Sequence, residues 1–351
     1  SILKKFKNSN VERISLALSA GVDSTLVLAF LKKTLPDLEI DAISIKFADS
    51  VDETKTAEKI AKHFGVNHHV LFVENYLKEL PKAISITKLP FWDLHWYYVA
   101  KKSKTFSNYL AAGDGGDEVF GGYTFRYAKF LSLINSKSSV LEKTQAYLKC
   151  HERDSVKDQE SIFGKKISFN WNFIYEQISS NFNNNLSSLD QVFLADYNGK
   201  LMNNFSPINN KINDYFELTS ITPLLSSELI SYATTLDPNQ KYSNTKNIGK
   251  LPLQQLLKKY NLDSLILKEK QGFSVNTLNL WKSHGHKICK NYLSDARIVE
   301  DKWINGDWIS KYIDQNDLDV SYINKFFGLL AFEIWYRLFI TKEMKSDTIL
   351  N

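Results

Sequence analysis

The sequence has few cysteines, no long apolar run and no block of like charge. Cys150 and Cys289 lie far apart and in no CxxC motif, which predicts two reduced core thiols. No apolar run approaches the roughly 18 residues of a membrane span. No apolar segment typical of a signal peptide follows Ser1–Lys7. These absences predict a protein of the reducing cytoplasm without a membrane partner.

The charge of the chain is mildly basic and evenly distributed. The net charge is +5 over 351 residues, with acidic and basic side chains interspersed. No run of about five like charges marks a nucleic-acid-binding tail, so a nucleic-acid partner is not expected. At roughly 150 residues per domain, the length suggests two domains.

The first part of the chain alternates between strand and helix patterns. Apolar runs predict strands, and helical segments follow near residues 24–35, 52–64 and 92–104. The expected strands are Arg13–Ser19, Glu39–Phe47, Asn67–Val73 and Asn108–Ala112. This order predicts an α/β fold with a doubly wound parallel sheet, in which ligands bind beyond the carboxyl ends of the strands.

Helical periodicity replaces the strand pattern from about Tyr123. Examples of it are Leu141–His151, Pro252–Tyr260 and Tyr322–Ile340. The polar stretch from residue 152 to 213 is not assigned. We therefore expect an α/β core over residues 1–125 and a mainly helical C-terminal region over residues 126–351, packed on the sheet edge.

A loop with the sequence SAGVDST, residues 19–25, joins the first predicted strand to a helix. Gly21 permits a tight turn and leaves room for an anion at the helix N-terminus. Candidate phosphate donors are the hydroxyl or N–H groups of Ser19, Val22, Asp23, Ser24 and Thr25. A carboxylate in an anion site points to a cation, so Asp23 predicts Mg²⁺. The alternative is an ordinary corner with Asp23 as a helix cap. The pattern is not a Walker loop.

A second loop, AGDGGDEVFGGY, spans residues 112–123 after the fourth predicted strand. It holds five glycines, and three carboxylates stand within five residues, at Asp114, Asp117 and Glu118. Such glycines allow unusual backbone conformations or a close approach to a ligand. The loop is typical of a metal–phosphate site, and the alternative is a set of solvated turn acids.

Together the two loops resemble the fingerprints SGGxDS and SGxGxDExFGGY of asparagine synthetases and relatives such as β-lactam synthetases. A third segment, Lys268–Phe273, resembles their RxKxGF motif. The resemblance covers residues 12–130 and 220–340. It implies a PP-loop ATP-pyrophosphatase that adenylates a carboxylate and transfers it to ammonia or another amine.

The resemblance also implies roles for single residues, with ATP and Mg²⁺ as cofactors. The implied nucleotide ligands are Ser19, Gly21, Asp23 and Ser24 for the pyrophosphate, and Ile45, Ala112 and Gly113 for the remainder. Asp23 and Asp117 would bind Mg²⁺. Lys270 would stabilise charge on the leaving pyrophosphate, and Asp114, in the place of a family Glu, would accept the proton of the attacking amine.

The chain departs from this family in its ammonia supply. Glutamine-dependent relatives carry a glutaminase domain before the first loop, which here begins at Ser19. We expect free ammonia, a different amine, or ammonia from a separate glutaminase subunit. Because the chain begins with Ser1 rather than Met, it can also be a fragment. A homodimer is compatible with the sequence.

The acceptor motif ExRxPFLD is also altered. Its place is taken by Thr219–Ser226, with Thr219 at the Glu position and Ile221 at the Arg position. A second family motif, KxxLR, reads Lys250–Gln254 without its Arg. Loss of a guanidinium removes a bidentate carboxylate partner, which puts aspartate in doubt as the acceptor.

An aromatic stripe at Phe91–Tyr98 is expected in the core, with a role in shaping the acceptor pocket as the alternative. Four functions follow from the motifs. The first is an aspartate- and ammonia-using ligase, and the second joins another carboxylate to another amine, as lactam formers do. A tRNA-modifying PP-loop enzyme and a non-catalytic nucleotide-binding relative are the others.

Overall fold

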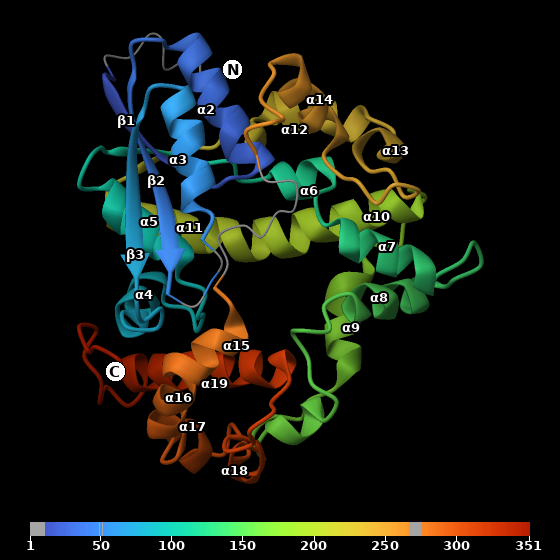
Figure 1. Ribbon diagram of the computed structural model, residues 1–351. Coiled ribbons are helices and arrows are strands. Elements are labelled where there is room, and N and C mark those ends of the chain that lie inside the picture. The colour runs from blue at the N-terminus through green and yellow to red at the C-terminus, as the bar shows by residue number, and fades with distance from the viewer. Residues whose placement is uncertain (1–10, 49, 51, 267–274) are drawn as a thin grey trace.

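The computed structural model describes residues 11–48, 50, 52–266 and 275–351, and it contains a five-stranded parallel sheet (Figure 1). The strand order is β3-β2-β1-β4-β5. The strands are β1 (Arg13–Ala17), β2 (Glu39–Phe47), β3 (Asn67–Val73), β4 (Tyr109–Ala111) and β5 (Thr219–Ile221). Helices flank the sheet, so the predicted α/β fold with a parallel sheet is confirmed.

Helices make up most of the remaining described residues. The α-helices are α2 (Val22–Thr34), α3 (Thr54–His63), α4 (Leu80–Thr87), α5 (His95–Ser103), α6 (Gly116–Phe120), α7 (Thr124–Leu133), α8 (Val140–Lys149), α9 (Trp171–Ser179), α10 (Ser188–Ala195), α11 (Ser206–Tyr215), α12 (Ser227–Thr235), α13 (Pro238–Lys241), α14 (Leu251–Lys259), α15 (Thr277–Leu280), α16 (His286–Leu293), α17 (Arg297–Glu300), α18 (Gly306–Tyr312) and α19 (Val320–Phe339). Two 3₁₀-helices, η1 (Gln159–Ile162) and η3 (Pro223–Leu225), and two π-helices, η2 (Asp196–Phe205) and η4 (Trp281–Gly285), complete the set.

The side chains of β1 alternate between two apolar layers, as a strand covered on both faces requires. Ile14 and Leu16 are fully buried with Leu26 of α2 in one cluster. Ala17 faces the other cluster, which includes Val99 of α5. Each fully buried side chain of this size contributes about 1.5–3 kcal/mol. The two layers fix β1, and with it the loop that follows, between α2 and α5.

The C-terminal half of the chain, which we expected to be mainly helical, also contributes the edge strand β5. Its partner is β4, with Tyr109 opposite Thr219 and Ala111 opposite Ile221. Three residues are too few for a two-residue alternation to stand out in the sequence. The strand brings the altered acceptor motif next to the second glycine-rich loop. The division of the chain at residue 125 stays a prediction.

The unassigned stretch before β5 is largely helical. Helix α10, the π-helix η2 and helix α11 follow one another without a break over residues 188–215. They form the long helix across the middle of Figure 1. Its end is tied to α5, because the Trp96 indole Nε1 donates to the Asn213 side chain at 3.0 Å. Helix α11 therefore covers one side of the region beyond the carboxyl end of β4.

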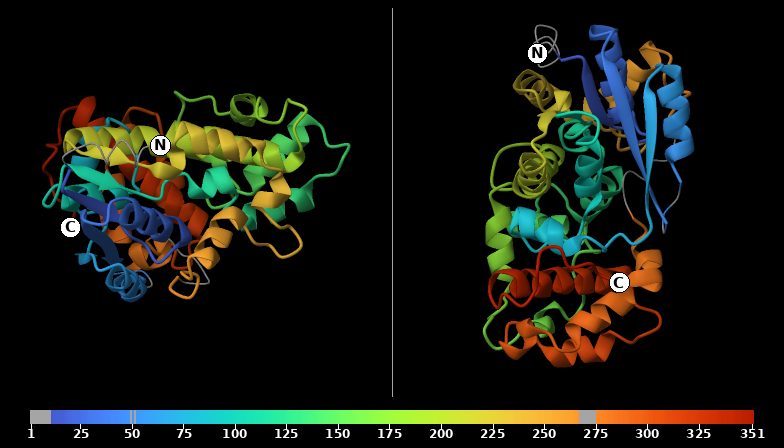
Figure 2. Two further views of the ribbon diagram at one scale, coloured as in Figure 1. Left: turned by 90° about the horizontal axis from the view of Figure 1, so that it is seen from above. Right: turned by 90° about the vertical axis from the view of Figure 1, so that its left-hand side faces the viewer.

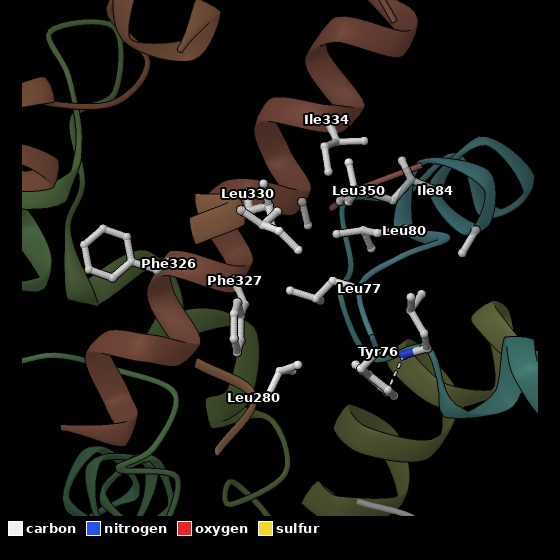
Figure 3. Close-up of a cluster of buried hydrophobic side chains, with 14 of the residues drawn as sticks. Tyr76, Leu77, Leu80, Ile84, Leu280, Phe326, Phe327, Leu330, Ile334 and Leu350 are labelled. Atoms are coloured by element: carbon white, nitrogen blue, oxygen red, sulfur yellow. Dashed lines mark hydrogen bonds between the residues drawn. The ribbon is translucent and has the colours of Figure 1, made fainter. Parts of the chain in front are cut away.

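The C-terminal helices form a layer beyond the ends of the strands, shown in orange and red in Figure 2. In Figure 3, Phe327 and Leu330 of α19 pack with Leu80 and Ile84 of α4, and Leu350 completes the cluster. This contact anchors the segment between β3 and α5. Of the helices in the described ranges, none has the length and apolarity needed to span a bilayer.

Candidate active site

The first loop lies between the carboxyl end of β1 and the N-terminus of α2. Gly21 is the residue before the helix, and no side chain caps the helix there. The loop is closed by its own hydroxyl groups: Ser24 Oγ donates to the Ser19 carbonyl at 3.0 Å, and Thr25 Oγ1 donates to the Gly21 carbonyl at 2.7 Å. The positive end of the helix dipole therefore points beyond the sheet, where an anion is favoured.

The second loop packs directly on the first, because β4 is the neighbour of β1 in the sheet. A Cβ atom at Gly113 would lie 2.7 Å from the Cβ atom of Asp23, and one at Gly116 would lie 2.3 Å from its Oδ1 atom. A Cβ atom at Gly122 would lie 1.9 Å from Asp117 Oδ1. These positions admit only glycine without displacement, so the glycines leave the space that the two aspartate side chains occupy.

Lys250 bridges the two carboxylates that the sequence assigns to Mg²⁺. Its Nζ atom lies 2.5 Å from Asp23 Oδ2 and 2.7 Å from Asp117 Oδ1. The Lys250 side chain is 6% exposed, so the bridge is largely screened from water. Its backbone N–H donates to the Phe120 carbonyl at 3.0 Å, which ties it to the second loop. We assigned Lys250 no role from sequence, although its KxxLR-like motif was a usable indication.

The donor chemistry of this cluster fits Mg²⁺ bound together with phosphates. Carboxylate oxygens are ligands that Mg²⁺ accepts, and the ion commonly completes its shell with phosphate oxygens and water. Within the described ranges, no group of three or more His, Cys, Asp and Glu side chains is arranged to hold a metal. Asp23 and Asp117 would therefore hold the ion only together with the nucleotide, beside the Lys250 ammonium.

Asp114 lies in the second loop, between the end of β4 and the start of α6. The Asn209 side chain of α11 donates to its Oδ2 atom at 3.4 Å. Burial raises the pKa of Asp114, and the Asp23 charge acts in the same direction. The His95 charge and the hydrogen bond from Asn209 act against this rise. A carboxyl group with a raised pKa is a stronger base when ionised, which suits proton transfer.

The other residues predicted for the site are either buried or outside the described ranges. Ile45 in β2 and Ala112 are 7% and 1% exposed, and their proposed contacts with the nucleotide stay predictions. Lys270, with its segment Lys268–Phe273, lies outside the described residues. Ile221 is 1% exposed in the core layer on the α2 side of the sheet. The position of the missing arginine is therefore a core position here.

We expect Gly116→Ala to slow ATP turnover about tenfold or more, because positioning errors of an ångström are costly in catalysis. The new methyl group would displace the Asp23 carboxylate, since its Cβ atom would lie 2.3 Å from Oδ1. The measurement is pyrophosphate release at saturating ATP. The matched control is Gly328→Ala in α19, where a Cβ atom meets nothing within 4 Å. Equal rates for both variants would contradict this geometry.

Comparison with known proteins shows which sequences this chain resembles. The family model of asparagine synthase matches residues 9–337. A glutamine-hydrolysing asparagine synthetase of Bacillus subtilis is 21% identical over 368 residues, which cover 95% of this chain and 57% of that protein. A putative glutamine-hydrolysing asparagine synthetase of Methanocaldococcus jannaschii is 32% identical over 139 residues, or 35% of this chain and 27% of that protein.

A further relative uses ammonia according to its name. An NH(3)-dependent NAD(+) synthetase of Malacoplasma penetrans is 30% identical over 137 residues, or 35% of this chain and 54% of that protein. The chain spans little more than half the length of the Bacillus relative, at 57%.

Proposed function

The chain belongs to the asparagine synthase family, and on that premise we propose that it adenylates a carboxylate with ATP and transfers the acyl group to an amine. The family accounts for an ATP-dependent ligase that forms C–N bonds. The observation that carries the specific chemistry is the Asp23–Lys250–Asp117 cluster at the N-terminus of α2. An uncapped helix N-terminus with a lysine and two carboxylates suits a metal-bound pyrophosphate group.

In the first step, an oxygen of the substrate carboxylate attacks the α-phosphorus of ATP. The bond from that phosphorus to the pyrophosphate oxygen breaks, and an acyl-adenylate forms. Mg²⁺ held by Asp23 and Asp117 would neutralise charge on the phosphates when bound. The residues of this chain position the pyrophosphate at the α2 N-terminus and place the Lys250 ammonium beside it, so that charge developing on the leaving group is stabilised.

In the second step, the nitrogen of the amine attacks the acyl carbon and AMP leaves. The nitrogen loses a proton as the amide forms, and Asp114 is the carboxylate to which we assign its acceptance. Asp114 is the third residue after β4 and lies beyond the carboxyl end of the sheet, where ligands of such sheets bind.

Aspartate and ammonia are the substrates we propose first. The ammonia-dependent relative and the asparagine synthetases support them. A different carboxylate is favoured by one observation: Ile221, at the place of the acceptor-binding arginine, is buried in the core. Ammonia would come from solution or from a glutaminase, which the glutamine-hydrolysing relatives make a reasonable partner. A homodimer stays a prediction. The free thiols of Cys150 and Cys289 support a cytoplasmic location.

The substrates can be identified by incubating the protein with ATP, Mg²⁺ and a panel of carboxylates, with and without ammonium. We expect one carboxylate to support release of pyrophosphate and AMP, and we expect the amide to appear only when the amine is added. Mass spectrometry of the products gives the identity of the amide. Asparagine from aspartate would establish the first proposal. An amide of another carboxylate would establish the second, and ATP binding without turnover in all combinations would contradict both.

A further inference from the structure

Strand β3, labelled in Figure 1, leaves two large apolar side chains in contact with water. Val70 is 49% exposed and Phe72 is 57% exposed. Both faces of a parallel sheet are normally covered, so the apolar side chains of its strands are expected to be buried. The alternate residues Leu71 and Val73 follow this rule, because they pack in the layer that includes α5. The face of β3 that carries Val70 and Phe72 therefore lacks a cover.

The same strand has a free backbone edge. β3 stands first in the order β3-β2-β1-β4-β5, and among the described residues it pairs only with β2. The Val73 carbonyl accepts the Ala48 N–H at 3.1 Å on the β2 side. Since peptide groups alternate in direction along a strand, those of Val70 and Phe72 point away from β2. Edge groups of this kind can pair with a strand of another chain.

A second copy of this chain supplies such a strand. Identical chains most often pair about a two-fold axis, and an axis perpendicular to the sheet sets β3 antiparallel to the β3 of the other copy. Residues that lie opposite each other must then point to the same face of the joined sheet. One residue of β3 therefore lies opposite itself, and near the middle of the exposed stretch this can be Val70, Leu71 or Phe72.

Of these three registers, the one centred on Leu71 matches the chemistry of the side chains. It places Val70 opposite the partner's Phe72, twice about the axis. It also places His68 opposite the partner's Glu74, where a carboxylate attracts an imidazole that can take a proton. A register centred on Val70 would oppose His68 and Phe72, and one centred on Phe72 would oppose Val70 and Glu74. Both of these pair an apolar side chain with a polar one.

We propose that two copies of the chain associate through β3, antiparallel and centred on Leu71, into one continuous sheet with five strands from each copy. Association removes Val70 and Phe72 from water and pairs the free peptide groups of the edge. The two-fold axis reverses the direction of the second sheet. The two candidate active sites therefore lie at opposite ends of the dimer, and this interface is independent of the proposed function.

The first test is the mass of the protein in solution, measured by analytical ultracentrifugation. We expect the wild type to be a dimer that dissociates on dilution. Phe72→Lys should be monomeric, because its charge would lie opposite the partner's Val70. Phe72 is more than half exposed, so this variant should fold, and circular dichroism measures that. The control Phe173→Lys changes an aromatic side chain of α9 that is 60% exposed, and it should stay dimeric.

A cysteine cross-link tests the register. With Leu71 on the axis, its Cα atoms in the two copies would lie about 4.5 Å apart, as in an antiparallel pair without mutual hydrogen bonds. A disulfide can span that distance, so Leu71→Cys should give a covalent dimer on oxidation. The control is Val70→Cys, whose two copies would lie diagonally across the strands at about 7–8 Å, too far for a disulfide. The native Cys150 and Cys289 are buried and should not react.

The outcomes separate the interface from the proposed function. A wild type that is monomeric at every concentration, or a Phe72→Lys variant that remains dimeric, overturns the proposal. A cross-link in Val70→Cys as strong as that in Leu71→Cys overturns the register. Pyrophosphate release should be equal in the wild type and in Phe72→Lys, because the interface is remote from both sites. If neither releases pyrophosphate with any carboxylate, the proposed function fails, and the ultracentrifugation still decides the interface.

Discussion

Asp117→Asn is expected to reduce pyrophosphate release by about a thousandfold, the size of effect seen when one preorganised charge-stabilising group is removed. Asp117 is one of two carboxylates held on the Lys250 ammonium, at 2.7 Å from Nζ. The substitution removes a negative oxygen ligand for the metal and leaves Lys250 with Asp23 alone. Lys250 would then be drawn toward Asp23 and away from the phosphates.

The fold should survive this substitution, because Asn has nearly the same shape and the Asp117 side chain is 19% exposed. The melting temperature of Asp117→Asn measures that directly. The matched control is Asp314→Asn, which removes an exposed aspartate paired with Lys290 at 2.8 Å. Exposed pairs of this kind contribute little, so the control should keep its activity. A folded Asp117→Asn variant that retains more than about a tenth of the wild-type rate would contradict the assigned role.

A second large effect, on protein stability, is expected when a buried ion pair next to the second loop is broken. Asp196, at the start of η2, is fully buried and accepts hydrogen bonds from the Arg126 guanidinium and from the Tyr147 hydroxyl. The Arg126 guanidinium also lies over the Tyr123 ring, at 4.5 Å from its centroid. Tyr123 is the last residue of the second glycine-rich loop. The Arg126–Asp196 pair therefore supports this loop through the contact of Arg126 with Tyr123.

Asp196→Ala should destabilise the protein by about 3–5 kcal/mol, because it leaves the Arg126 charge buried and uncompensated. Thermal unfolding followed by circular dichroism should show a fall in melting temperature of about 5 °C or more.

Replacing both partners with apolar residues, as in Arg126→Met with Asp196→Leu, should recover much of this loss, since apolar pairs often substitute for buried ion pairs without penalty. If the single and the double variant melt at the wild-type temperature, the pair does not stabilise the fold. If both fall equally, shape rather than charge is the cause.

The two loops of the site could be predicted from the sequence because each is local. The residues that build a loop, its glycines and its carboxylates all stand within one short segment after a strand, as at Ser19–Thr25. The parallel sheet then places both segments at one edge, and this too follows from the order of strands and helices. The predicted strands β2 and β3 match the structure for the same reason, because each is one continuous run, of nine and seven residues.

The remainder of the site depends on contacts between distant segments. Lys250 is 227 residues from Asp23 in sequence, so only the folded chain shows that it joins the carboxylates. His95 is hidden in an aromatic run whose other members, such as Trp96 and Tyr97, are core residues. Strand β5 is too short to show a period, and without it Ile221 could not be recognised as a core residue.

The bond at which ATP is cleaved decides whether this site adenylates a carboxylate. Phosphorus-31 NMR of a reaction with ATP, Mg²⁺, the active carboxylate and the amine distinguishes AMP and pyrophosphate from ADP and phosphate. We expect AMP and pyrophosphate in equal amounts, no reaction when the carboxylate is left out, and a rate about a thousandfold lower in Asp117→Asn. Formation of ADP and phosphate, or cleavage that does not depend on a carboxylate, would contradict the assignment of this site to adenylation.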